Sequence, residues 1–252
     1  MLTLAGVCIL VGMLLGFVGA GGAGVMVSLL TLGFHLPIHQ AVGTSLAAMF
    51  FVTLSGALSH FREGNTNVRV GVLVGLAGVV GAVAGAGIGQ SIPEHILQPM
   101  AGVALWVLAA LVFLRARLSG KLVAAHDPSE AVPTVRQTTG TIALGATGGV
   151  ASAFFGVGMT PFLQLGMLTI LKMSLVKTIG TTMLALIFIS LGGGIALATH
   201  GDVSYPHLVG ATIGMTVGSY IGAKFTRRAP LPLLRGAIVL TPFIAGTLLI
   251  FF

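Results

Sequence analysis

The chain has 252 residues, of which 56% are hydrophobic and only 7% are charged, and its mean hydropathy is +1.08. A water-soluble domain needs a polar surface, so this composition excludes a soluble enzyme and a soluble domain behind a secretory signal. The net charge of +7 arises from twelve Lys and Arg against five acids. These cations are scattered over short loops, without the basic stripe typical of nucleic-acid binding, so no nucleic-acid partner is expected.

Eight apolar runs follow one another along the chain, four in each half. A membrane-spanning helix needs roughly 20 apolar residues, and each run is about that long or longer. We therefore predict an all-α integral membrane protein embedded in a lipid bilayer. The runs are Leu2–Phe34, Ala41–Phe61, Val70–Gln90, Ile96–Leu114, Thr138–Leu171, Ile179–Thr199, Leu208–Phe225 and Leu233–Phe252.

The two halves share motifs at a constant offset of 137 residues, and weak internal symmetry of this kind is typical of transporter repeats. The offset pairs Gly19-Ala-Gly21 with Gly156-Val-Gly158, Gly43-Thr44-Ser45 with Gly180-Thr181-Thr182, and Pro93 with Pro230. We predict an N-terminal membrane repeat at 1–114, a cytoplasmic linker at 115–137 and a C-terminal membrane repeat at 138–252.

The positions of the cations predict how the repeats are oriented. Lys and Arg near span ends stay on the cytoplasmic side of a membrane. If each half crossed four times, the twelve cations would divide six against six. If the first run of each half instead turns back at its glycines, all twelve cations lie on the same side of the membrane. The repeats are then inverted, with the linker inside, both termini extracytoplasmic and three further transmembrane helices in each repeat.

Glycines break the first run of each repeat, at Gly19–Gly22 and at Gly156–Gly158, because glycine is a poor residue inside a helix. Length alone slightly favours a re-entrant hairpin in each repeat over two short spans, and both remain open. Gly81-x3-Gly85 and Gly218-x3-Gly222 have the small-x3-small spacing that predicts close helix packing.

Gly-Ala-Gly-Gly-x-Gly at Gly19–Gly24 and His39-Gln-Ala-Val-Gly-Thr-Ser45 resemble motifs of the TauE/SafE sulfite exporters, also called toluene sulfonate uptake permeases. Phe155-Gly-Val-Gly158-Met-Thr-Pro161 and Lys177-Thr-Ile-Gly-Thr-Thr182 echo them in the second half. The resemblance covers nearly the whole chain. It implies transport of sulfur-containing anions such as sulfite, sulfonates or sulfoacetate across a bacterial cytoplasmic (inner) membrane, and leaves the anion and the direction open.

We expect the substrate site near the midplane, between the two glycine breaks and the two Gly-Thr pairs, at each of which we expect a helix to begin. Glycine backbone N–H groups and threonine or serine hydroxyls suit an oxyanion, and hydroxyls avoid the cost of a fixed buried charge, roughly 2.5–3.5 kcal/mol. For Gln164, binding substrate and bonding between helices are both open, and the hydroxyls can instead bond to their own helices. The predicted site residues are Gly19, Gly21, Gly22, Thr44, Ser45, Gly156, Gly158, Gln164, Thr181 and Thr182.

We expect no metal, cofactor or enzymatic activity. His35 and His39 have the spacing of a metal pair but flank Pro37 without an accompanying carboxylate or thiolate, and no phosphate-binding loop is present. All five acids fall in loops or at span ends, so a coupling proton would need a histidine, the substrate or a loop acid. A membrane-embedded enzyme and a non-transporting assembly subunit are the alternatives to a secondary transporter.

Overall fold

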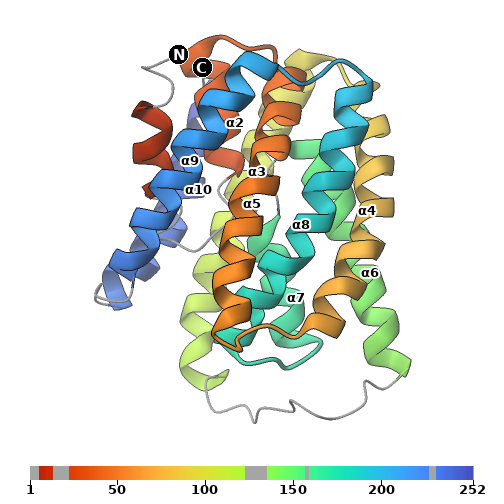
Figure 1. The fold of residues 1–252 in the computed structure, drawn as a ribbon, viewed down its shortest axis with the longest axis vertical. Coiled ribbons are helices and arrows are strands. Elements are labelled where there is room, and N and C mark those ends of the chain that lie inside the picture. Colours follow the sequence, from red (N-terminus) through yellow and green to blue (C-terminus); the bar gives the residue numbers. More distant parts are fainter. Residues whose placement is uncertain (1–5, 14–22, 123–134, 157–158, 227–230, 252) are drawn as a thin grey trace.

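A computed structural model describes residues 6–13, 23–122, 135–156, 159–226 and 231–251. These residues form a bundle of long helices without a strand among them (Figure 1). The first half contains a helical segment at 6–13, α2 (Ala23–Ser28), a π-helical turn η1 (Leu29–Gly33), α3 (Ile38–Arg62), α4 (Val68–Gln90) and α5 (Glu94–Leu122). The second half contains α6 (Val135–Phe155), α7 (Thr160–Thr169), α8 (Leu175–Thr199), α9 (Tyr205–Thr226) and α10 (Leu231–Phe251).

Four of the described helices are long and apolar enough to cross a membrane: α3, α4, the Glu94–Leu111 part of α5, and the Lys177–Thr199 part of α8. Their outward faces carry large apolar side chains such as Val80, Ile195 and Leu58, which are half exposed or more. In water such surface would be unfavourable, but in a bilayer it contacts lipid. The all-helical membrane fold predicted from composition is therefore confirmed.

The predicted linker at 115–137 is helical at both of its ends. Residues up to Leu122 continue α5, and α6 begins at Val135. Arg, Leu and Lys are good helix formers, so a helix continues past the apolar span when its polar residues can reach water.

The second half begins with a helical hairpin. α6 rises from the lower end of the bundle in Figure 1, the chain turns at Gly156, and α7 returns toward the lower end, where α8 begins. α7 has only 10 residues, about 15 Å of helix, which is too short to cross a bilayer. In this half the structure thus favours the re-entrant hairpin over two spans. The glycines at 19, 21 and 22 lie outside the described residues.

Glycine allows α4 and α6 to pack backbone against backbone. A Cβ added to Gly81 would lie 2.0 Å from the Ala146 carbonyl oxygen, and one added to Gly85 would lie 2.3 Å from the Val150 carbonyl oxygen. Real Cβ atoms do not approach so closely, so both positions require glycine. The packing role predicted for the small-x3-small motif is confirmed in α4, and Gly218 of α9 has the same role against Ile9.

The same helix offers a matched pair of substitutions that measures this packing. Gly81→Ala should lower the melting temperature in detergent, because the new methyl group forces α4 away from α6. Gly87→Ala adds the same methyl group where no atom lies within 4 Å, and should leave the melting temperature unchanged or raise it slightly, since alanine is the better helix former. Equal effects of the two substitutions would contradict backbone-to-backbone packing.

Candidate functional site

The turn between α6 and α7 contains, among its described residues, two with positive φ, a backbone conformation that glycine adopts most easily. Gly156 has φ +67° and Met159, which precedes α7, has φ +37°, both in the left-handed region that favours glycine. A Cβ on Gly156 would lie 2.9 Å from the Val42 Cα and 3.0 Å from a methyl group of Val27. The break is therefore pressed against the second turn of α3, where a larger residue would not fit.

Within the part of the chain that the structure describes, three buried hydroxyl groups without a hydrogen-bond partner lie around this break, and others, such as that of Thr178, lie elsewhere. Ser45 is 1% exposed, and Ser152 and Thr160 are fully buried. Buried hydroxyls are nearly always hydrogen-bonded, and each one left without a partner costs about 1–3 kcal/mol. The three hydroxyls therefore mark a place where a polar ligand would be stabilised.

Contacts between the helices put these three hydroxyls at one level of the bundle. A Cβ on Gly193 of α8 would touch Leu46 at 2.6 Å and Ala153 at 3.4 Å, which are the chain neighbours of Ser45 and Ser152. Across the hairpin, a Cβ on Gly148 of α6 would lie 2.5 Å from Leu163 of α7, and one on Gly166 would lie 2.2 Å from Leu144. In this antiparallel register Thr160 is level with Ser152.

Helix periodicity shows that the three side chains face the break. Ser152 lies one turn after Gly148, which packs against Leu163 of α7. It also lies three residues after Gly149, which packs against Gly78 of α4, so it lies on the side of α6 between these two neighbours. Thr160 lies three residues before Leu163, on the face of α7 that packs against α6. Ser45 lies three residues after Val42, which contacts Gly156. Residues three and four apart share a helix face, so the hydroxyls converge from three helices.

The N-terminus of α7 adds backbone donors to this group. Its N-cap residue, Met159, makes no side-chain cap, and the first helical bond runs from the Leu163 N–H to the Met159 carbonyl, at 3.0 Å. The N–H groups of Thr160 and Phe162 precede it and have no acceptor within α7, while Pro161 has no N–H. A helix N-terminus with unused donors favours an anion.

Gln164 is 8% exposed and lies one turn after Thr160, on the same face of α7, so its amide group extends the polar surface below the hydroxyls. We define the hairpin site as Ser45, Ser152, Gly156, Thr160 and Gln164. Sequence reasoning identified Ser45, Gly156 and Gln164 but missed Ser152 and Thr160. Gly19, Gly21, Gly22 and Gly158 lie outside the described residues.

The remaining predicted residues among those described, Thr44, Thr181 and Thr182, already have hydrogen-bond partners. The Thr44 hydroxyl accepts a hydrogen bond from the Ser204 N–H, and the Thr181 hydroxyl accepts one from the Asn67 N–H, both at 2.9 Å. The Thr182 hydroxyl donates to the Thr178 carbonyl at 2.7 Å. Because α3 and α8 are antiparallel, Thr44 and Thr181 lie near opposite ends of the bundle, roughly 20–25 Å apart along the helix axes. The structure does not bring the two Gly-Thr segments together.

The polar residues of the hairpin site belong to the second half alone, apart from Ser45. At the 137-residue offset, Ser152, Thr160 and Gln164 correspond to Leu15, Ala23 and Val27. A search for residues shared by the two halves therefore could not point to Ser152 or Thr160.

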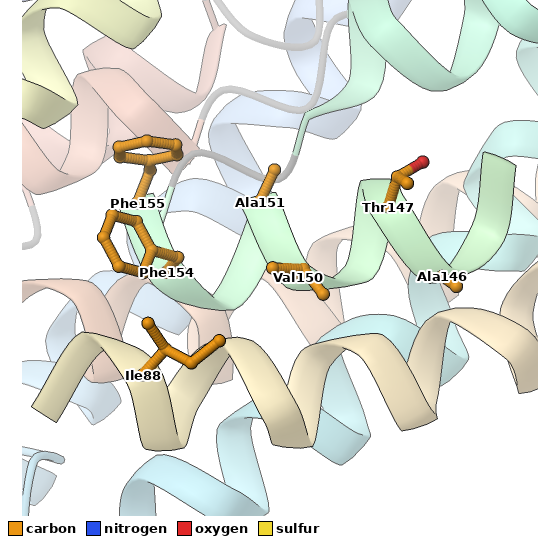
Figure 2. A pocket seen from close by; sticks show the side chains of 7 residues that line it. All are labelled: Ile88, Ala146, Thr147, Val150, Ala151, Phe154 and Phe155. Carbon is orange, nitrogen blue, oxygen red and sulfur yellow. The ribbon is translucent and has the colours of Figure 1, made fainter. Parts of the chain in front are cut away.

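A concave surface between α4 and α6 differs in character from the hairpin site. Figure 2 shows this groove of about 460 Å³, lined by Ile88 and by six residues of α6, among which Thr147 is the only one with a polar side chain. The Thr147 hydroxyl donates to the Ala143 carbonyl of its own helix at 2.7 Å. The groove therefore presents an apolar wall suited to lipid chains, and offers no group of donors for an anion.

The hairpin site predicts an unusual response to loss of a hydroxyl. Thr160→Val keeps the side-chain shape and removes an oxygen that has no partner, so the ligand-free protein should melt at the same temperature or higher. Thr44→Val removes the acceptor of the Ser204 N–H and should lower the melting temperature. A lower melting temperature for Thr160→Val, measured in detergent without added anion, would show that the Thr160 hydroxyl is engaged within the protein.

Comparison with known proteins agrees with this membrane architecture. The chain is 43% identical over 245 residues to "Probable membrane transporter protein YdhB" of Bacillus subtilis (strain 168), covering 97% of this chain and 98% of that protein. It is 28% identical over 223 residues to a "Probable membrane transporter protein" of Xylella fastidiosa (strain 9a5c), covering 86% and 83%. No solved structure matches the chain. The model of the family described as "Sulfite exporter TauE/SafE" matches residues 4–249, so the chain belongs to this family of membrane transporters.

Proposed function

We propose that this protein is a secondary transporter of small sulfur-containing anions, of the sulfite, sulfonate or sulfoacetate type, in a bacterial cytoplasmic membrane. The observation that carries the proposal is the convergence of three unpartnered, buried hydroxyls on the N-terminus of α7. An oxyanion bound there accepts hydrogen bonds from the Ser45, Ser152 and Thr160 hydroxyls and from backbone N–H groups. These are the donors that the ligand-free site leaves unused.

The charge pattern limits the kind of anion that such a site holds. The twelve Lys and Arg all lie outside the apolar cores of the runs, so the bound anion is neutralised by dipoles and not by a fixed cation. Burial of charge is costly without a counter-charge, and more so for two charges than for one. A monoanion, such as a sulfonate or hydrogen sulfite, therefore fits the hairpin site better than a dianion such as sulfate.

We further propose that the halves are inverted repeats that provide alternating access to the hairpin site. The contact of Gly149 with Gly78 recurs 137 residues away as Gly12 with Met215. The left-handed backbone of His35 recurs at Lys172, each with φ +52°. α3 descends and α8 ascends in Figure 1, as an axis in the membrane plane requires.

The cations support an inside face at the lower end of Figure 1. Arg62 ends α3, Arg69 lies in the first turn of α4, and Lys172 and Lys177 flank the start of α8, all at this end. Glu94 begins α5 at the upper end. Under the positive-inside rule, the lower end faces the cytoplasm and both termini face outward.

Transport by purified protein in liposomes tests the function. The parent should accumulate radiolabelled sulfite or a small sulfonate, and Thr160→Val and Ser152→Ala should each weaken apparent affinity about 5- to 100-fold, as expected for losing one hydrogen bond to a charged ligand. Thr147→Val, on α6 but facing the groove, is the matched control and should transport like the parent. Parent-like transport by the double variant Ser152→Ala/Thr160→Val would reject the hairpin site.

Topology gives a separate test of the inverted arrangement. Single cysteines introduced near Glu94 and near Asp202 should react with an impermeant thiol reagent added outside intact cells, whereas cysteines at 123–134 should react only after permeabilisation. Cys8→Ala, which removes the only native cysteine, provides the background. Labelling of the 123–134 segment and of the C-terminus from the same side would refute inversion.

A further inference from the structure

Two of the hydrogen bonds that join the halves lie at opposite ends of the bundle, and in another the Gln90 amide at the end of α4 donates to the Asp202 carboxylate near the upper end. At the upper end of Figure 1 the Thr44 hydroxyl of α3 accepts the Ser204 N–H, in the turn that leads into α9. At the lower end the Thr181 hydroxyl of α8 accepts the Asn67 N–H, in the turn that leads into α4. Both distances are 2.9 Å, and both threonines are fully buried.

The glycine before each threonine allows the opposite turn to approach closely. A Cβ on Gly43 would lie 2.2 Å from the Asp202 carbonyl oxygen, and one on Gly180 would lie 2.3 Å from the Asn65 carbonyl oxygen. Each turn also contains a glycine with positive φ, Gly201 at +83° and Gly64 at +71°. We call Gly43, Thr44, Asp202 and Ser204 the upper latch, and Gly180, Thr181, Asn65 and Asn67 the lower latch.

Each latch is a specific and breakable contact. A hydroxyl that accepts one backbone N–H contributes about 0.5–1.5 kcal/mol net, which is large enough to bias a conformational equilibrium and small enough to open. In each latch the turn before a helix, α9 or α4, presents a backbone N–H to the opposite half. Ser45 of the hairpin site is the chain neighbour of Thr44, so the upper latch lies directly beside the site.

We infer that the two Gly-Thr pairs are latches that hold opposite ends of the protein closed, and that opening the upper or the lower latch exposes the hairpin site to one side of the membrane. This inference rests on the proposed transport function. It assigns Thr44 and Thr181 to the control of access and not to contact with the substrate.

Sided labelling of a buried cysteine tests the latches without any substrate. In a Cys8→Ala background, Ser45→Cys places a thiol where the parent side chain is 1% exposed. Thr44→Val should raise its labelling rate by an impermeant methanethiosulfonate about fivefold to tenfold from the upper-latch side alone, the shift expected for one lost hydrogen bond. Thr181→Val should raise the labelling rate from the opposite side alone. The two sides are compared by labelling right-side-out and inside-out vesicles.

Two controls separate latching from general loosening. Thr53→Val, on α3, removes a buried hydroxyl that bonds only to carbonyls of its own helix, and should not change the sidedness. Thr44→Ser retains the acceptor and should restore the parent rate. If Thr44→Val does not fold, Gly43→Ala provides the second route, because its methyl group displaces the Asp202 carbonyl while Thr44 remains.

The results decide the inference either way. Equal increases from both sides, or no increase for either threonine variant, would overturn the latches. If the parent transports but the variants show no increase in labelling rate from one side alone, the proposed function stands and the latches are rejected. A sided shift in a protein that transports none of the tested sulfur anions would support the latches and reject the proposed substrate class.

Discussion

The structure of this protein depends on the free-energy cost of leaving backbone and hydroxyl groups without hydrogen-bond partners in hydrocarbon. A continuous helix satisfies its own backbone, so the chain can stop being helical inside the membrane only where other protein groups or a ligand take over. That occurs between α6 and α7, where Gly156 adopts φ +67° and lies against Val42. The unused donors at the start of α7 follow from the break, and they are the basis of the anion site that we propose there.

Close packing by glycine fixes the helices around this break relative to one another, as the proposed binding of a small ligand requires. Gly81 and Gly85 fix α4 against α6 at backbone distance, and α6 carries Ser152 to the level of Ser45. A hydrogen-bonding site loses its selectivity when its donors shift by about an ångström. The glycines at these helix contacts therefore keep Ser45, Ser152 and Thr160 in a fixed position relative to one another.

Much of this architecture could be predicted from the sequence, because hydropathy and glycine position depend on the local chain. The helices of the apolar runs, the break at Gly156 and the packing role of Gly81 all follow from local properties. The roles of Thr44 and Thr181 could not, since their partners Ser204 and Asn67 lie 160 and 114 residues away. Nor does α3 begin at its Gly-Thr pair; it begins at Ile38, which places Thr44 in the second turn.

In the proposed mechanism the two latches are equivalent, whereas the hairpin site takes most of its polar residues from the second half. Both properties have a physical reason. Exchange between two open forms is efficient only when their free energies are close, and equivalent contacts at both ends, such as those of Thr44 and Thr181, keep them close. A single small anion needs only one set of donors, and a second set would leave further polar groups without partners in hydrocarbon. The first half instead has Ala23 and Val27 where the second has Thr160 and Gln164, so the proposed site carries a single set of polar groups, and a bound anion would offset the cost of the unpaired Thr160 hydroxyl.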